Sequence, residues 1–158
     1  MAEITFTKVK LPYGWLGNMS AHPVVWRGKT YPTTEHLFQA LRFDENHPII
    51  DEICSHNSPM RAKMAVKPYL NETIIEPRSL EDIENMIKVL NLKIDTHTDL
   101  RDALINTGDR TIIEDVSARP SESGLFWGAK RDGTGWTGYN ILGECWMSIR
   151  REIRSQLQ

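Results

Sequence analysis

Residues 34–43 carry the side chains with the clearest capacity for chemistry. As a helix, this segment would place four polar or aromatic side chains on one face, at positions i, i+3, i+4 and i+7: Glu35, Phe38, Gln39 and Arg42. That face would offer a carboxylate, an amide and a cation beside an aromatic ring, which suits the binding of a polar ligand. Glu35 would lie in the first turn, where the helix dipole favours an ionised carboxylate. A solvated helix face with a Glu–Arg pair explains the same spacing, so both interpretations stay open.

Residues 126–143 form a second segment, in which aromatic, glycine and charged residues alternate closely. The stretch Trp127–Gly133 lacks the Gly-Lys-Ser/Thr ending of a phosphate loop, but its glycines permit close approach of a ligand to the backbone. Asn140 precedes an apolar periodic segment and is a predicted helix N-cap, where an anion such as phosphate can bind. Turn glycines around a core tryptophan are the alternative explanation.

Further ionisable residues could take part in acid–base or covalent chemistry. Glu114 lies near the end of a β-branched run, and Asp132 lies beside Gly133. Lys29 precedes the predicted Glu35 helix. A lysine that is desolvated in a pocket can form a Schiff base with an aldehyde, although most lysines are simply solvated. The five histidines show no metal-ligand spacing, so we expect no metal. We expect no other cofactor either.

The elements that must position these side chains are mostly helices. Helix-start residues and helical apolar spacing predict helices over residues 34–43, 49–55, 60–66, 83–94, 95–105 and 141–155. Alternation and β-branched content predict short strands over residues 4–9 and 111–116, and residues 117–124 are predicted to form a polar loop. No linker or repeat divides the sequence, which favours one mainly α-helical domain with a small β part over residues 1–158.

Composition fits an ordinary globular protein. The 158 residues are 40% hydrophobic and 25% charged, and the net charge of −2 gives no general basic face for nucleic acid. Two local basic patches remain, at Lys130-Arg131 and at Arg150-Arg151-Arg154. Cys54 and Cys145 lack metal or redox spacing, and we expect both to be reduced and buried, with a disulfide between them as the alternative. Since no apolar run approaches bilayer length and the first residues lack a secretory signal pattern, we expect a soluble cytoplasmic protein with no membrane contact.

The order of the motifs along the chain resembles the NADAR family, also called YbiA-like. The resemblance begins with the loop Tyr13–Asn18 and the segment Gly28–Ala40, which contains the Thr-x-Glu-His-x-Phe-Gln-Ala pattern. Further matches follow in family order: Ser58-Pro59-Met60, Ile113-Glu114, Trp127-Gly128, Gly133, Asn140, Leu142-Gly143, Met147 and Arg150. The resemblance covers nearly the whole chain and implies a mostly helical N-glycosidase without a metal.

Cleavage of an N-glycosidic bond needs help at two places. The ribose C1 develops oxocarbenium character that a carboxylate can stabilise, and the departing base needs a proton. By motif position, the resemblance together with the residue chemistry implies four catalytic residues: Glu35, Glu114, Asp132 and Lys29. The resemblance implies Asn18, Trp127, Gly128 and Asn140 as substrate-binding residues, and the face of the predicted helix adds Gln39 and Arg42.

Three departures from the family pattern bear on this assignment. The chain has Gly17 where the family often has serine, and Arg42 where it often has lysine. It also lacks the acidic residue that commonly precedes the Trp-Gly pair, having Ser123-Gly124-Leu125 there. The last change shifts weight to Glu114 and Asp132 as the acidic partners of Glu35.

The resemblance implies two substrate classes. One is ADP-ribose attached to guanine in nucleic acid, and the other is a ribosylamino-pyrimidine phosphate of riboflavin biosynthesis. The departure before Trp127 and the basic pair Lys130-Arg131, which could meet a nucleic-acid phosphate, favour the first class. The partner is therefore expected to be ADP-ribosylated nucleic acid or a small nucleotide-like substrate. A non-catalytic ADP-ribose or nucleotide binding module is the rival interpretation.

Overall fold

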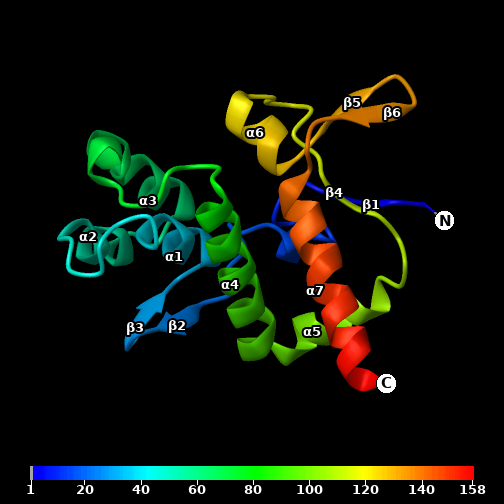
Figure 1. Ribbon diagram of the computed structural model, residues 1–158, viewed down its shortest axis with the longest axis horizontal. Coiled ribbons are helices and arrows are strands. Elements are labelled where there is room, and N and C mark those ends of the chain that lie inside the picture. Colours follow the sequence, from blue (N-terminus) through cyan, green and yellow to red (C-terminus); the bar gives the residue numbers. More distant parts are fainter. Residues whose placement is uncertain (1) are drawn as a thin grey trace. The chain divides into compact units, whose positions relative to one another are not determined.

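The computed structural model describes residues 2–158 and divides the chain into two compact units (Figure 1). The central unit is the continuous segment Asn18–His97. The terminal unit combines the N-terminal segment, up to Gly17, with Thr98–Gln158.

The central unit is a helical cluster with one β-hairpin. Its elements are β2 (Val24–Trp26), β3 (Lys29–Tyr31), α1 (Thr34–Ala40), α2 (Ile49–Ser55), α3 (Pro59–Ala65), the 3-10 helix η2 (Lys67–Glu72) and α4 (Leu80–Thr96). Hydroxyl caps fix three of the helix starts. The side chains of Thr33, Ser58 and Ser79 accept hydrogen bonds from backbone N–H groups in the first turns of α1, α3 and α4.

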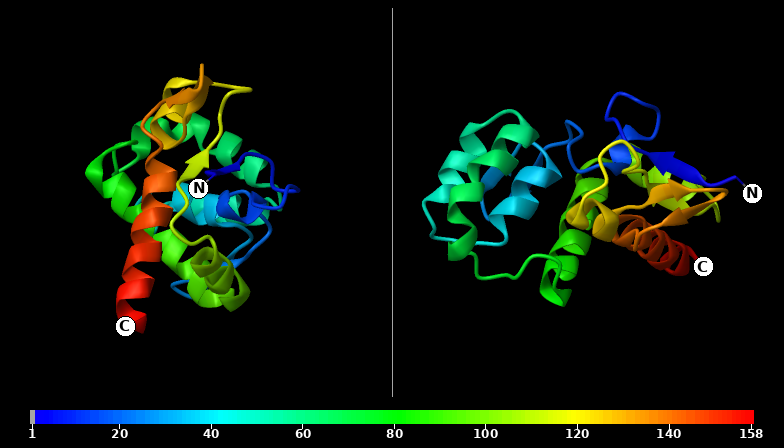
Figure 2. Two further views of the ribbon diagram at one scale, coloured as in Figure 1. Left: turned by 90° about the vertical axis from the view of Figure 1, so that its right-hand side faces the viewer. Right: turned by 90° about the horizontal axis from the view of Figure 1, so that it is seen from above.

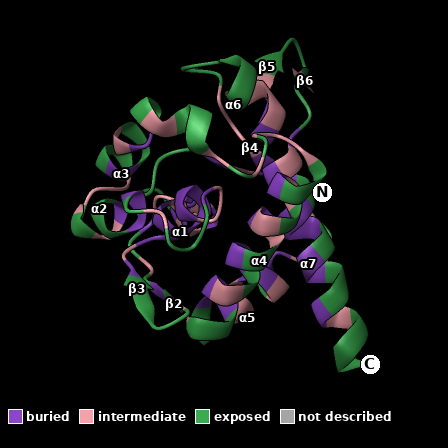
Figure 3. Cartoon of the chain, turned by 60° about the vertical axis from the view of Figure 1, so that its left-hand side comes forward, coloured by how far each residue is buried: buried purple, intermediate pink, exposed green. Residues whose placement is uncertain are grey.

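The core of the central unit surrounds α1. Leu37 on α1, Ile53 on α2 and Leu90 on α4 are fully buried, and α1 packs against α2, α3 and α4. Every residue of α1 is buried except Glu35, which is partly exposed. Figure 3 shows α1 as an almost wholly buried coil. A helix this short gains its stability from such packing, because seven residues do not hold a helix alone.

The terminal unit joins segments from both ends of the chain. Its elements are β1 (Ile4–Phe6), the 3-10 helix η1 (Gly14–Leu16), α5 (Thr98–Asn106), β4 (Ile112–Glu114), α6 (Glu122–Trp127), β5 (Lys130–Asp132), β6 (Gly135–Thr137) and α7 (Ile141–Leu157). Strands β1 and β4 pair in parallel, with Ile4 opposite Ile112 and Phe6 opposite Glu114. Strands β5 and β6 form an antiparallel hairpin, and α6 packs against α7 (Figure 2).

Trp146 organises the core of the terminal unit. Its side chain on α7 is fully buried, and its indole Nε1 donates to the backbone oxygen of Leu16 over 2.8 Å. The ring of Trp15 meets it edge to face, with centroids 5.9 Å apart. One tryptophan therefore holds the N-terminal segment against the last helix.

The mainly helical class with a small β part is confirmed, but local differences from the predicted elements occur near residues 117–140. The predicted polar loop ends early, because Ser121 caps a short helix that begins at Glu122. The β5–β6 hairpin was not predicted. Asn140 precedes α7 as expected, yet its side chain does not cap the helix, and its backbone is left-handed with φ of 52°. None of the helices within residues 2–158 is both long enough and apolar enough to cross a membrane.

Candidate active site

Glu35 has a fixed position at the start of α1. Its backbone N–H donates to the carbonyl of Asn18 over 3.0 Å, and its carboxylate Oε2 accepts from Gln39 Nε2 over 2.7 Å. Gln39 is buried and lies one turn later, as the sequence spacing predicts. A neutral amide donor orients the carboxylate without supplying a positive charge. Glu35 can therefore face developing positive charge on a ligand.

Asn18 ties the preceding loop to the same helix. Its side-chain Oδ1 accepts from the hydroxyl of Thr34 over 2.8 Å, and its Nδ2 donates to the sulfur of Met86 over 3.1 Å. The residue is buried. The structure thus brings three of the predicted residues together in the central unit: Asn18, Glu35 and Gln39.

Arg42 lies just after α1 and anchors that helix to α4. Its Nε and Nη2 donate to the two carboxylate oxygens of Asp82 over 2.9 Å and 2.7 Å. Asp82 is fully buried, and it also accepts from the backbone N–H of Arg78. The guanidinium lies 4.7 Å from the ring centroid of Phe38. The structure places Arg42 in a buried ion pair, with 12% of its side chain exposed.

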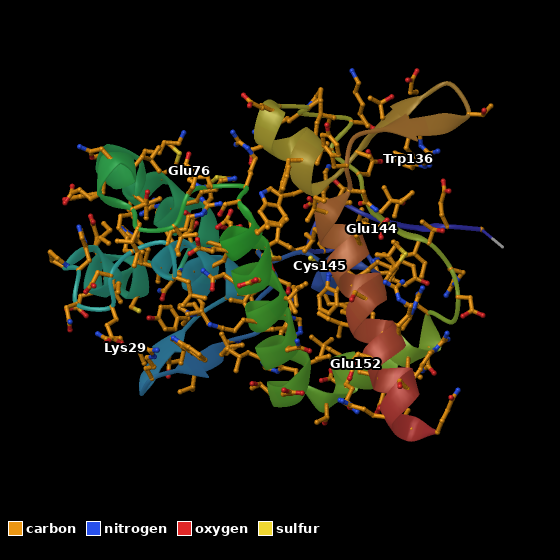
Figure 4. The ribbon with its side chains drawn as sticks, in the orientation of Figure 1. Lys29, Glu76, Trp136, Glu144, Cys145 and Glu152 are labelled. Atoms are coloured by element: carbon orange, nitrogen blue, oxygen red, sulfur yellow. The ribbon has the colours of Figure 1, made fainter. Side chains whose placement is uncertain are left out.

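Lys29 has surroundings that disfavour a Schiff base. It lies on β3 in the β2–β3 hairpin (Figure 4), and its ammonium donates to Asp51 over 2.5 Å. The hydrogen bond to Asp51, together with its charge, raises the pKa of Lys29 above its ordinary value. A Schiff-base lysine needs the opposite shift, because only the neutral amine attacks a carbonyl.

Lys93 is a functional candidate that the sequence analysis missed. It is fully buried on α4, and its Nζ donates to the hydroxyl of Ser20 over 2.7 Å. Ser20 Oγ in turn lies 2.9 Å from Nδ1 of His22. Burial lowers the pKa of Lys93 to about 7. The signal in the sequence was its register, four residues after Val89 on the apolar face of α4.

In the terminal unit, Asn140 holds β4 through both ends of its amide. Its Oδ1 accepts from the backbone N–H of Glu114 over 3.0 Å, and its Nδ2 donates to the carbonyl of Ile112 over 2.9 Å. The backbone N–H of Asn140 donates to the carbonyl of Gly128 over 3.0 Å. Three predicted residues therefore meet at one place: Glu114, Gly128 and Asn140.

Gly128 is required by the close approach of two backbone segments. A Cβ at this position would lie 2.6 Å from the carbonyl oxygen of Glu114 and 2.9 Å from a methyl carbon of Val116. Only glycine lets the chain pass β4 this closely. Trp127 precedes it and is buried, with its ring edge to face against Phe126 at 4.9 Å.

Asp132 belongs to the β5–β6 hairpin. Its carboxylate accepts from the hydroxyl of Thr137 over 2.6 Å and is exposed to solvent. On the same hairpin, Arg131 lies 4.3 Å from the ring centroid of Trp136, whose Nε1 donates to Glu3 over 3.0 Å. The carboxylate of Asp132 is therefore held by a contact within the hairpin, and not by the contact between Glu114 and Asn140.

A metal-binding cluster is not found among the described residues. Within residues 2–158, no group of three or more histidine, cysteine, aspartate or glutamate side chains is arranged to hold a metal ion. The site chemistry described above consists of carboxylates, amides and lysines.

Comparisons with known proteins cover nearly the entire chain. The family model for the NADAR domain matches residues 5–154. The N-glycosidase Npun_R5314 of Nostoc punctiforme is 33% identical over 156 residues, which are 98% of this chain and 94% of that protein. The N-glycosidase YbiA of Escherichia coli K12 is 31% identical over 153 residues, covering 95% of this chain and 88% of YbiA.

The fold also matches a solved structure. The NMR structure of E. coli YbiA superposes with a TM-score of 0.74 at 28% sequence identity, covering 99% of this chain and 88% of that one. A family model that spans the chain and relatives above 30% identity confirm the family that the sequence motifs indicated. The chain is therefore an N-glycosidase that belongs to the NADAR family.

Proposed function

We propose that this N-glycosidase removes ADP-ribose from guanine in nucleic acid by hydrolysing the bond between the ribose C1 and the base. The observation that carries the chemical part of the proposal is the partial exposure of Glu35 on the buried helix α1. Glu35 is the one partly exposed residue on a helix that is otherwise buried. A carboxylate at such a place is accessible to a ligand and keeps a defined direction.

Glu35 is the residue proposed to act at C1. As the glycosidic bond breaks, the ribose carbon acquires positive charge, and an ionised carboxylate stabilises it or directs a water toward it. The hydrogen bond from Gln39 fixes the carboxylate, and the first-turn position favours its ionised form. Asn18 supports this geometry by accepting from the backbone N–H of Glu35.

The remaining predicted residues differ in how well their surroundings fit the proposed roles. Glu114 is proposed as a second catalytic carboxylate, held in place through its backbone by Asn140. Trp127, Gly128 and Asn140 are proposed to line the substrate-binding part of the terminal unit. Asp132, Lys29 and Arg42 stay predictions with weaker support, because each is held in a hydrogen bond or ion pair of its own.

The choice of substrate is supported by the hairpin. Arg131 lies on β5 with 55% of its side chain exposed, beside the half-exposed ring of Trp136 and 3.9 Å from a carboxylate oxygen of Glu3. An exposed cation next to an aromatic ring suits a phosphate and a base of a nucleic-acid strand. ADP-ribosylated nucleic acid would use such a surface, whereas a free pyrimidine nucleotide would not need it.

One relative favours a second candidate function. The riboflavin biosynthesis protein VVA0006 of Vibrio vulnificus is 26% identical over 147 residues, which are 90% of this chain and 36% of that protein. Hydrolysis of a ribosylamino-pyrimidine phosphate is therefore the alternative proposal.

The test is incubation of the full chain with guanine-ADP-ribosylated DNA and, separately, with the ribosylamino-pyrimidine phosphate, with products identified by mass. Release of ADP-ribose from the DNA supports the first proposal. Release of ribose 5-phosphate from the pyrimidine substrate alone supports the second. ADP-ribose binding without turnover of either substrate would overturn both and point to a binding module.

A further inference from the structure

Four arginines of the terminal unit lie on two segments that contact each other. They come from the loop at residues 107–111 and from the second half of α7: Arg110, Arg150, Arg151 and Arg154. Two carboxylates accompany them in these same segments, Asp109 and Glu152. The chain as a whole has a net charge of −2, so this local excess of positive charge is a departure from the average surface.

Two of the guanidinium groups converge on Thr107. Arg150 Nη1 donates to the hydroxyl of Thr107 over 2.8 Å, and Arg110 Nε donates to its backbone carbonyl over 3.2 Å. Thr107 is buried, and Arg150 is also buried, with only 5% of the residue exposed. Both acceptors belong to Thr107, which is buried and therefore fixed in position. They orient the guanidinium groups of Arg150 and Arg110.

The neighbours of Arg150 are mostly of like charge. Burial lowers its pKa, the charges of Arg154, Arg151 and Arg110 lower it further, and Asp109 raises it. Asp109 is 79% exposed at its side chain and pairs with Arg154 over 2.5 Å. An exposed carboxylate that is already paired offsets little of the repulsion at a buried guanidinium.

Positively charged arginines placed close together repel one another, and an anion bound between them would relieve this repulsion. A guanidinium group presents N–H donors in a geometry that fits the acceptor oxygens of a phosphate. Arg150 has five such donors and uses one of them on the hydroxyl of Thr107. Gly108, in the middle of the loop, adopts a positive φ of 67°, and no heavy atom would lie within 4 Å of a Cβ there. The loop therefore has open space at Gly108 itself.

We propose that Arg110, Arg150, Arg151 and Arg154 form a phosphate-binding site around Thr107. The ligand is a phosphate group, carried either by a nucleic-acid strand or by a small phosphorylated molecule. This site goes beyond the proposed hydrolysis, because none of its residues has a role at the glycosidic bond.

The experiment measures phosphate binding with the full chain. Inorganic phosphate and a single-stranded oligodeoxythymidine are titrated separately at low salt, by calorimetry and by amide NMR shifts. Binding of either probe, with shifts at Gly108 and along residues 150–154, is the expected result. Binding of phosphate alone identifies the small-molecule source, and tighter binding of the oligonucleotide identifies the nucleic-acid source.

A double variant separates the site from general surface charge. Arg151→Gln with Arg154→Gln should weaken binding at least tenfold and should reduce the salt dependence of oligonucleotide binding by about one to two charges. The matched control is Arg27→Gln, an exposed arginine of the central unit that is paired with Glu45. The proposal is overturned if neither probe binds, if the shifts lie elsewhere, or if Arg27→Gln weakens binding as much as the double variant.

The design also keeps this proposal apart from the proposed function. The double variant should retain turnover of a small N-glycoside substrate, and Glu35→Gln should retain phosphate binding at the arginines. Loss of turnover with intact phosphate binding, or the reverse, tells which of the two proposals has failed.

Discussion

The guanidinium of Arg42 binds the carboxylate of Asp82, 40 positions away in the sequence, through two hydrogen bonds, one to each carboxylate oxygen. Asp82 is fully buried and lies in the first turn of α4, so the pair fixes the angle between that helix and the end of α1. The geometry that orients Glu35 and Gln39 depends on this junction, because both lie on α1.

Removing one partner of this pair should therefore destabilise the protein strongly. Arg42→Ala leaves an uncompensated buried carboxylate, and we expect the free energy of unfolding to fall by about 3–5 kcal/mol. Urea unfolding followed by circular dichroism measures this. Arg27→Ala removes an exposed pair with Glu45 and should cost below about 1 kcal/mol. Equal losses in the two variants would refute a structural role for Arg42.

Glu35→Gln should abolish most of the turnover while keeping the fold. The substitution removes the negative charge that is proposed to face the ribose C1, and we expect kcat to fall by about 10²- to 10⁴-fold. Because Glu35 is partly exposed, the unfolding midpoint should change little. Glu45→Gln, on an exposed loop, serves as the control for a lost carboxylate. Normal turnover by Glu35→Gln would remove this residue from the mechanism.

Lys93 should make stability rise with pH above neutrality. Its pKa is about 7 in the folded protein and ordinarily near 10.5, so the unfolded chain binds more protons between these values. Unfolding free energy should then increase from pH 7 to pH 10.5, by at most on the order of 5 kcal/mol. Below pH 7 the penalty for the buried charge is fully present.

The measurement for Lys93 is urea unfolding at several pH values for the wild type and for Lys93→Met. The variant cannot titrate at this position, so the difference between the two curves isolates the lysine from other groups such as Tyr31 and Cys145. Parallel curves would mean that the buried ammonium is already compensated and that its pKa is ordinary.

Gly128→Ala should disrupt the terminal unit. The added Cβ would lie 2.6 Å from the carbonyl oxygen of Glu114, so β4 or the chain after α6 must shift. We expect a loss of about 1–3 kcal/mol in unfolding free energy, together with weaker substrate binding. Gly135→Ala is the matched control, because its Cβ would meet the nearest atom at an ordinary 3.8 Å. A similar small effect in both variants would contradict the tight approach.

Much of the fold is predictable from local chemistry. Ser58 followed by Pro59 marks the start of α3, and Thr33 marks the start of α1, because a hydroxyl cap acts on N–H groups two or three residues away. The face of α1 that carries Glu35 and Gln39 follows from helical spacing alone. Such features need no knowledge of the rest of the chain.

The features that the sequence did not predict depend on contacts between distant residues. Asn140 was predicted to cap α7, but its side-chain amide instead forms hydrogen bonds with the backbone of β4, at Glu114, 26 residues earlier, and at Ile112. The pKa of Lys93 is lowered by burial, and its hydrogen-bond partner Ser20 lies 73 positions away. The pairing of Arg42 with Asp82 was likewise not predictable, since nothing in the local sequence around Asp82 indicates an ion pair with a residue 40 positions away. Packing, rather than local propensity, decides each of these cases.

The parallel pairing of β1 with β4 has a consequence for the order of folding. The strand that contains Ile4 can pair only after the strand that contains Ile112 has been synthesised. The central unit, in contrast, is one continuous segment of the chain. Closing a loop of about a hundred residues is slow compared with packing neighbouring helices. On the ribosome, the central unit can therefore assemble while the first strand is still unpaired, and the terminal unit completes the molecule only when α7 has emerged.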